Sequence, residues 1–302
     1  MSTSTIITVE SPVKALTARL TDYLELTKPR IVLLELIVAS AAACLAAPHS
    51  LDMRVLLYAL AGTGLVAASA SIANQWWERD NDTLMPRTFD RPIPAGRVSS
   101  FEAVILSLIS LIAGTSLLVW QVNQLTAGLG LASWVLYVLI YTPLKTRSPF
   151  NTTVGAIAGA IPILMGWTAT GTPIGLTALA LALVLFLWQF PHFMAIAWIY
   201  RDDYAAAGHR MLTVVDPSGV RAGAQAVLGA AALLPVSLIP AVIPTGGSPL
   251  LYLTWTFCLG AILLGLSIRF AIFRDDHSAR LLLRASLIFL PAWLSMLLVV
   301  TL

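Results

Sequence analysis

The chain has 302 residues, of which 58% are hydrophobic and 11% are charged, and its formal net charge is +3. Soluble globular domains carry about 25% charged residues, so this chain has too few charged groups to cover a water-exposed surface. The composition excludes a cytosolic enzyme, a disordered protein and a nucleic-acid-binding module. The mean hydropathy of +0.84 indicates instead a protein that crosses a membrane several times.

Apolar runs that are long enough to span a bilayer recur along the chain. Residues 1–25 precede them, lack the continuous apolar core of a signal peptide, and are predicted to form a cytoplasmic tail. Residues 26–302 are predicted to be a single membrane-embedded domain. The expected fold is all-α, with nine transmembrane helices around a central cavity. The predicted spans are 31–47, 54–75, 101–120, 125–141, 152–170, 175–197, 223–243, 249–268 and 285–302.

The basic residues are distributed unevenly between the two ends of these spans. Arg54 is the single Lys or Arg expected at one end, and all the others fall in the N-terminal tail or after the second, fourth, sixth and eighth spans. Cytoplasmic loops are enriched in Lys and Arg, which predicts a cytoplasmic N-terminus and a C-terminus on the opposite side. The long loops after the second and sixth spans then face the cytoplasm, where we expect the chemistry.

The loop after the second span begins with side chains that offer oxygen ligands. Asn74, Glu78 and Asp82 are four residues apart and share one face if the helix continues through them. Mg²⁺ prefers oxygen ligands and often bridges one or two carboxylates to substrate phosphates. Arg87 and Arg91 follow, and guanidinium groups suit phosphate oxygens. The pattern predicts a site for Mg²⁺ and a diphosphate, and the alternative is that these charges only set the topology.

A second acidic pair, Asp202 and Asp203, occupies the matching position after the sixth span. The sequence around it weakly repeats that of the first loop, which indicates two four-helix units presenting acidic clusters to one cavity. This pairing favours the metal-site interpretation over topology alone. The predicted metal ligands are Asn74, Glu78, Asp82, Asp202 and Asp203.

The motifs resemble those of the UbiA superfamily of intramembrane prenyltransferases, in which an Asn is followed by an acid four residues later and an Asp four residues after that. The superfamily's second motif often has two Asp residues four apart, whereas Ala207 stands four residues after Asp203. Several strings over residues 26–212 are similar to the heme-modifying branch of the superfamily. These are LTKPR at 26–30, ERDND at 78–82, RPIPAGRV at 91–98, YTPLKTRSPFN at 141–151, LWQFPHFMAIAW at 187–198 and DDYAAAG at 202–208.

The resemblance implies an enzyme that uses Mg²⁺ to transfer a farnesyl group from farnesyl diphosphate to a vinyl group of heme b, with hydration. It implies that Gln189 and His192 lie at the heme, although a single His in an apolar helix is more often structural. Membrane lipid, and heme A synthase or terminal oxidase assembly factors, are the other implied partners, in a bacterial inner membrane. The implied catalytic residues are Asn74, Glu78, Asp82 and Asp203. The implied diphosphate-binding residues are Arg87, Arg91, Lys145 and Arg147.

Two alternatives stay open at this point. One is another prenyltransferase of the same superfamily that acts on a quinone precursor or a chlorin, which the heme-type strings disfavour. The other is a secondary transporter, since internal repeats, broken helices and intramembrane acids occur in that class too. The acids here lie at the ends of spans rather than near the bilayer midplane, which argues against transport.

Overall fold

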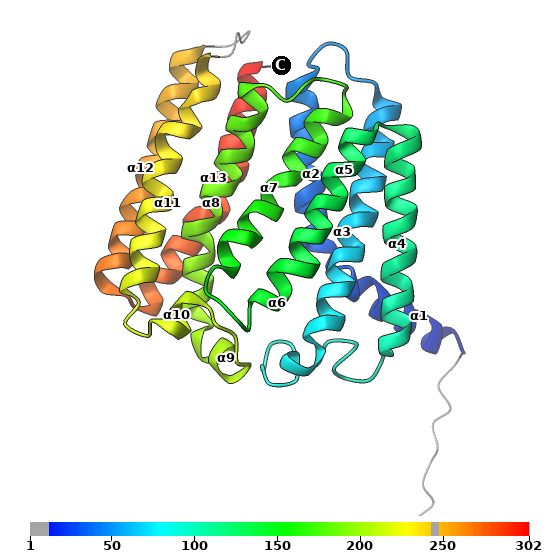
Figure 1. Cartoon of the computed structure of the whole chain (residues 1–302). Coiled ribbons are helices and arrows are strands. Elements are labelled where there is room, and N and C mark those ends of the chain that lie inside the picture. Colours follow the sequence, from blue (N-terminus) through cyan, green and yellow to red (C-terminus); the bar gives the residue numbers. More distant parts are fainter. Residues whose placement is uncertain (1–11, 243–247, 302) are drawn as a thin grey trace, which may run out of the picture.

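The computed structural model describes residues 12–242 and 248–301, and within these ranges the chain is helical and contains no strand. Nine segments of the described chain are long and apolar enough to cross a membrane, and Figure 1 shows them side by side. The predicted all-helical, nine-span architecture is confirmed. The elements are α1 (Pro12–Leu26), α2 (Pro29–Ala46), α3 (Met53–Asp82), α4 (Ser100–Gln121), α5 (Gln124–Val135), the π-helix η1 (Leu136–Tyr141), α6 (Thr142–Leu144), α7 (Asn151–Ala169), α8 (Leu176–Ile199), α9 (Arg201–Ala206), α10 (Leu212–Val215), α11 (Val220–Leu238), the 3₁₀-helix η2 (Ile239–Val242), α12 (Pro249–Phe273) and α13 (Asp276–Thr301).

Two spans, α3 and α13, extend furthest beyond the ranges predicted from their apolar runs. Helix α3 ends at Asp82 rather than at residue 75, and α13 begins at Asp276 rather than at residue 285. The start of α13 is held by Asp275, whose Oδ1 accepts a hydrogen bond of 2.7 Å from the backbone N–H of Ser278. Hydropathy marks the part of a helix that lies in lipid, whereas capping decides where the helix ends.

The fourth span is interrupted by the π-helix η1. Pro143 has no N–H, so it cannot donate the α-helical hydrogen bond to the carbonyl of Leu139. The backbone N–H of Thr142 instead bonds to the carbonyl of Tyr137, five residues earlier. Its side-chain hydroxyl donates to the same carbonyl at 2.8 Å. Because a π-turn inserts one residue into the helix, it changes the direction in which the following side chains point.

Small residues let the central helices approach closely, as is common in membrane bundles. A Cβ atom added to Gly166 of α7 would collide with the backbone of Ala39 in α2. On the other side of the bundle, the indole N–H of Trp293 in α13 donates to the hydroxyl of Tyr252 in α12 at 2.9 Å. That hydroxyl in turn donates to the carbonyl of Ser237 in α11 at 2.6 Å. Close packing thus joins α2 to the distant α7, and hydrogen bonds join the last three spans to one another.

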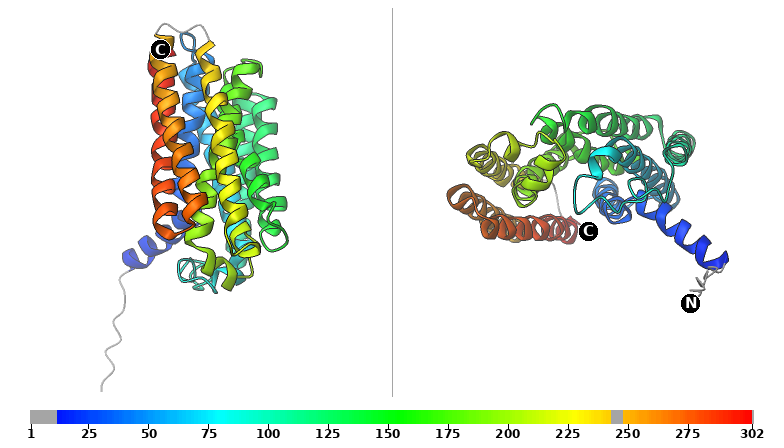
Figure 2. Two further views of the ribbon diagram at one scale, coloured as in Figure 1. Left: turned by 90° about the vertical axis from the view of Figure 1, so that its left-hand side faces the viewer. Right: turned by 90° about the horizontal axis from the view of Figure 1, so that it is seen from below.

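The long connections gather at one end of the bundle, which lies at the bottom of Figure 1. The last turn of α3 contacts the segment after α9 through a 2.8 Å hydrogen bond from Asn81 Nδ2 to the carbonyl of Ala207. The backbone N–H of Arg210 donates to the carbonyl of Lys145 at 2.6 Å. Helix α1, within the expected N-terminal tail, lies outside the bundle at this same end (Figure 2).

Candidate functional site

A cavity of about 660 Å³ opens at the end of the bundle where the long loops meet. Its walls come from the end of α1, the start of α2, the last turns of α3, the loop after α3, the end of η1, the residue after α6, and α9 with the segment after it. Six of the residues that the sequence singled out line it: Asn74, Glu78, Asp82, Arg87, Arg91 and Lys145.

The stripe of oxygen-bearing side chains formed by Asn74, Glu78 and Asp82 is part of this wall. Asn74, Glu78 and Asp82 lie on the final turns of α3, so the expected continuation of the helix brings all three to the same face. Glu78 is 6% exposed and Asp82 is 0% exposed. Carboxylates as buried as these need compensating positive charges or strong hydrogen-bond donors.

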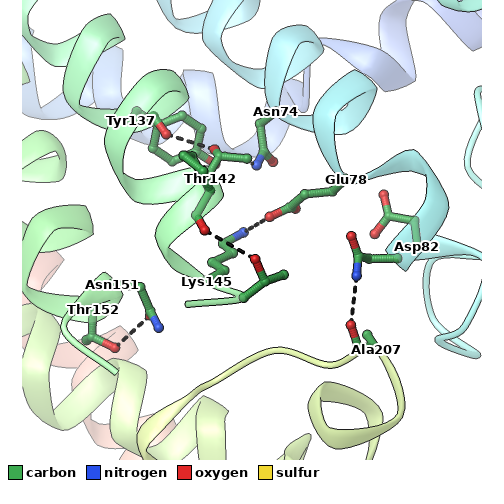
Figure 3. A network of polar contacts seen from close by, with 12 residues as sticks. Asn74, Glu78, Asp82, Tyr137, Thr142, Lys145, Asn151, Thr152 and Ala207 are labelled. Atoms are coloured by element: carbon green, nitrogen blue, oxygen red, sulfur yellow. Dashed lines mark hydrogen bonds and ion pairs between the residues drawn. The ribbon is translucent and has the colours of Figure 1, made fainter. Parts of the chain in front are cut away.

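A basic side chain contacts each residue of the stripe, and Figure 3 shows the contact between Lys145 and Glu78. Lys145 Nζ lies 2.7 Å from Glu78 Oε1, and Arg91 donates to Asp82 Oδ2 at 2.7 Å. Lys28 donates to the side-chain oxygen of Asn74 at 2.7 Å. The amide nitrogen of Asn74 donates to the hydroxyl of Thr142 at 3.0 Å, which connects the stripe to the π-helix. Three cationic side chains of the cavity thus contact three oxygen-bearing side chains.

The pKa values of Lys28 and Lys145 are shifted in opposite directions because the two lysines have different charged neighbours. Burial, together with the positive charges of Arg91 and Lys145, lowers the pKa of Lys28 to about 7. Burial also works against the charged form of Lys145, but Glu78, Tyr141 and Tyr137 together raise the pKa of Lys145 above its ordinary value. Burial and the charge of Lys145 lower the pKa of His209 to about 4. Lys145 is therefore a fixed positive charge at neutral pH.

The donor set fits a divalent cation bound with an anionic ligand. Within the described residues, no group of three or more His, Cys, Asp or Glu side chains forms a complete metal site. Magnesium does not require one, because it usually takes one or two protein carboxylates and completes its shell with water and phosphate oxygens. Asp82 Oδ1 is buried and has no hydrogen-bond partner in the described part of the chain, so it has a free lone pair to offer.

The second acidic pair lies beside the cavity rather than on its wall. Asp203 Oδ2 is 3.9 Å from Arg87 Nε, while Asp202 is exposed. The guanidinium group of Arg87 also lies over the rings of Tyr200 and Tyr204, at 4.9 and 5.0 Å. The two loops do converge as expected. However, Arg87 rather than either Asp faces the cavity, so the structure does not bring the five predicted metal ligands together.

Three further predicted residues lie away from the cavity. Arg147 is exposed beyond the end of α6. Gln189 is buried, and its amide nitrogen donates to the carbonyls of Ala156 and Leu185 at 2.9 and 3.1 Å. His192 lies within α8, where its Nδ1 is 2.9 Å from the hydroxyl of Ser286 in α13 and its ring stacks on Trp188. Gln189 and His192 therefore belong to the bundle interior, a turn or more away from the loops.

Among the lining residues that the sequence did not assign to the cavity are Lys28, Tyr141, Tyr204 and His209. The signal for Lys28 was the string Lys28-Pro29-Arg30 at the start of the first span. Pro29 begins α2, and the left-handed backbone of Lys28 (φ 51°) turns the chain from α1 into α2. Tyr141 lies under the ammonium group of Lys145, whose Nζ is 4.7 Å from the ring centroid.

The UbiA prenyltransferase family profile matches residues 36–296. The chain belongs to this family. Among its relatives, the protoheme IX farnesyltransferase of Rhodopirellula baltica is 46% identical over 276 residues, which cover 89% of this chain and 96% of that protein. The mitochondrial protoheme IX farnesyltransferase of Arabidopsis thaliana is 41% identical over 90% of this chain and 63% of its own length.

Solved structures show the same fold. A digeranylgeranylglyceryl phosphate synthase structure superposes with a TM-score of 0.79 at 17% identity, covering 94% of this chain and 98% of that one. A UbiA homolog from Archaeoglobus fulgidus, solved with GPP and Mg²⁺, superposes with a TM-score of 0.67 at 14% identity, covering 91% and 99%. The chain is therefore a multi-pass membrane prenyltransferase. The resemblance found in its sequence is confirmed, and the secondary-transporter alternative has no support.

Proposed function

We propose that this prenyltransferase is a protoheme IX farnesyltransferase, which converts farnesyl diphosphate, heme b and water into heme O and diphosphate. The observation that carries the proposal is its 46% identity, over nearly the whole chain, to a relative of that name. The cavity supports it independently, because a diphosphate requires clustered cations at a membrane enzyme's polar end. A quinone precursor or a chlorin as acceptor is the second candidate within the family.

The cationic side chains of the cavity would hold the leaving diphosphate. Lys28, Arg91 and Lys145 come from three different segments and meet over the stripe of α3. When the bond between the farnesyl C1 and its oxygen breaks, the electron pair stays on the diphosphate, and preorganised cations stabilise that charge. Arg87 adds a fourth cation at the edge, where Asp203 orients it. Arg147 would act only by long-range attraction, since it lies outside the cavity.

Asn74, Glu78 and Asp82 would hold Mg²⁺, with Asp203 and Asp202 nearby in α9. The ion, when bound, supplies charge neutralisation for the diphosphate oxygens. The unpartnered Oδ1 of Asp82 supports this assignment. So does the A. fulgidus relative of the same fold that was solved with GPP and Mg²⁺. The lysine and arginine partners of these carboxylates would then turn from them toward the substrate phosphates.

The carbon skeleton would be joined inside the bundle. The vinyl carbon of heme b forms a bond with farnesyl C1, which leaves a positive charge on the carbon next to the porphyrin ring. Water adds to that carbon and releases a proton. The aromatic ring of Tyr141 next to the lysine, and that of Tyr204 across the cavity, would shield the allylic cation. The apolar spans would enclose the farnesyl chain.

His192 is the candidate contact to the heme. Ser286 donates its hydroxyl proton to the carbonyl of Leu283 at 2.7 Å, so its oxygen accepts a hydrogen bond from Nδ1–H of His192. Nδ1 then carries the ring proton, and Nε2 keeps a free lone pair that suits a heme iron or a proton to be removed. Gln189, one turn earlier, would hold α8 against α7 through Ala156.

The cavity is proposed to face the cytoplasm of a bacterium, with the protein in the inner membrane. The enrichment of Lys and Arg at the cavity end supports this orientation. Farnesyl diphosphate would then reach the cationic groups from the cytoplasmic side, and heme b from the surrounding lipid. Heme A synthase or terminal oxidase assembly factors are the proposed recipients of the product.

The test is a reconstituted assay. Purified protein in lipid nanodiscs is supplied with Mg²⁺, farnesyl diphosphate and heme b. The hemes are then extracted and separated by chromatography, and their masses are measured by mass spectrometry. We expect a heme whose mass has increased by one farnesyl group and one water, and its loss in Asp82→Asn. Diphosphate release with an aromatic acceptor but not with heme b would replace the proposal by the quinone-precursor alternative. No release with any acceptor would contradict both.

A further inference from the structure

Helix α1 carries an apolar face that the rest of the described chain does not cover. Leu16, Leu20 and Leu24 are spaced by four residues, so they lie along one side of the helix. Their side chains are 61%, 58% and 58% exposed. Three large exposed apolar side chains in one row, on a helix only 15 residues long, are typical of a surface that binds another apolar phase.

The three leucines are exposed although α1 is firmly attached to the rest of the protein. Arg19 donates to the carbonyl of Arg97 at 2.7 Å and pairs with Glu102 at the start of α4. Asp22 accepts a hydrogen bond of 2.7 Å from Arg97, and the hydroxyl of Tyr23 donates to Glu102 at 3.1 Å. Polar contacts thus fix α1 on the loop before α4, while its leucine row stays open.

The place of α1 in the molecule indicates what covers this row. In the left view of Figure 2 the helix extends sideways from the lower end of the bundle, and in the right view, from below, it projects beyond the bundle. A membrane crossed by the spans would meet water at this end. It leads directly into α2, whose outer residues Ile31, Leu33 and Leu34 are also half-exposed or more. Since α2 is long and apolar enough to span a membrane, Leu33 and Leu34 are expected to face lipid, whereas Ile31 also lines the cavity. The leucine row of α1 is therefore continuous with a lipid-facing surface.

We propose that α1 is an interfacial helix that lies along the surface of the membrane crossed by the spans, with Leu16, Leu20 and Leu24 in the acyl region. An amphipathic helix of this kind is stabilised at the headgroup boundary, because lipid accepts its apolar side and water its polar side. Thr21, Leu24 and Glu25 also line the cavity, so the same helix forms a cavity edge at the lipid boundary. The proposal depends on the membrane topology and not on the identity of the acceptor.

The test measures lipid contact at two positions of the same helix. Cys44 and Cys258 are first replaced by Ala, and Leu20→Cys or Ala18→Cys is then labelled with a nitroxide in nanodiscs of phosphatidylcholine and phosphatidylglycerol. Ala18 is the matched control, because it lies nearly opposite Leu20 on the helix and is exposed. Collision with oxygen, which concentrates in lipid, is compared with collision with a water-soluble nickel chelate.

We expect the oxygen-to-nickel ratio at position 20 to be severalfold higher than at position 18, and close to that of a label at Ile109→Cys on the outer face of α4. Position 18 should match a label at the exposed loop residue Pro217→Cys. Equal, water-like ratios at positions 18 and 20 would overturn the proposal. Shielding of position 20 from both reagents would also overturn it, and dipolar broadening of its spectrum would then identify a second copy of the chain as the cover.

Discussion

At the scale of single residues, the cavity is a set of opposite charges held together by burial. Glu78 and Lys145 are mostly enclosed and 2.7 Å apart, and Asp82 is fully enclosed against Arg91. Two charges taken out of water are stable only while each compensates the other. An anion with its own metal ion can satisfy both members of such a pair at once. The arrangement therefore favours ligands that bring positive and negative charge together.

This pairing predicts a specific loss in Glu78→Gln. The amide keeps the shape of the side chain but removes the charge, so we expect kcat to fall by about 100-fold, which is the order seen when one electrostatic group is lost from an active site. The matched control is Asp80→Asn on the same helix, whose side chain is 84% exposed and points away from the stripe. Turnover is measured as heme product in nanodiscs, and equal activities in the two variants would contradict the assignment.

A second prediction concerns Ser286, which contacts His192 rather than substrate. Ser286→Ala removes the oxygen that accepts the Nδ1 proton, so the ring is free to change tautomer and turn. We expect heme b to bind more weakly and its Soret band to shift toward that of His192→Ala, with Ser286→Thr restoring both. A spectrum unchanged in Ser286→Ala and His192→Ala would remove His192 from the heme site.

At the scale of elements, an irregular helix places the central lysine. Lys145 follows a π-turn, and this turn lies directly before Pro143, which cannot donate the regular hydrogen bond. Changing a helix by one residue rotates everything after it by about 100°. Local chemistry at one proline thus decides whether the ammonium group of Lys145 faces Glu78.

Pro143→Ala supplies the missing N–H and allows an ordinary α-helix to form through this region. We expect the ion pair to be lost and turnover to fall by about tenfold or more, because small displacements of a catalytic group are costly. Pro173→Ala, at the opposite end of the bundle, is the control, since only its carbonyl is used, by the indole of Trp167. If both variants retain full activity, the π-turn is dispensable for positioning Lys145.

At the scale of the whole molecule, the packed bundle brings the ends of distant segments to one side. The cavity joins residues from α1, α3, η1 and the segment after α9, while the connection between α2 and α3 lies at the other end. The basic residues follow the same division, with Arg54 alone at the far end. The fold therefore places the cavity at the basic end of the bundle, which is the end that the charge distribution predicts to face the cytoplasm.

The orientation can be tested with cysteines at the two ends. In a variant with Cys44→Ala and Cys258→Ala, we expect Ser50→Cys to react with an impermeant thiol reagent in intact cells whose outer membrane has been made permeable. Pro217→Cys, at the cavity end, should react only after the inner membrane is opened. Both positions are exposed, so access depends on the side of the membrane. The reverse pattern would place the cavity outside.

The sequence by itself determined the class of protein, the number of spans, the basic end and the stripe from Asn74 to Asp82. These are local properties, because hydropathy and a four-residue spacing depend only on neighbours along one helix. The same local rules left the helix ends uncertain, since the polar turns of α3 and α13 continue beyond their apolar runs.

Only the tertiary structure decided which residues share the cavity. Lys28, Tyr141 and His209 come from three separate segments, and no spacing in the sequence connects them to Glu78. The structure also decided that Arg87, rather than Asp202, faces the cavity from between the two acidic loops. The physical reason is that the side chain reaching a shared space depends on how distant helices pack and turn. In this protein, that packing depends on one π-turn and on close helix crossings.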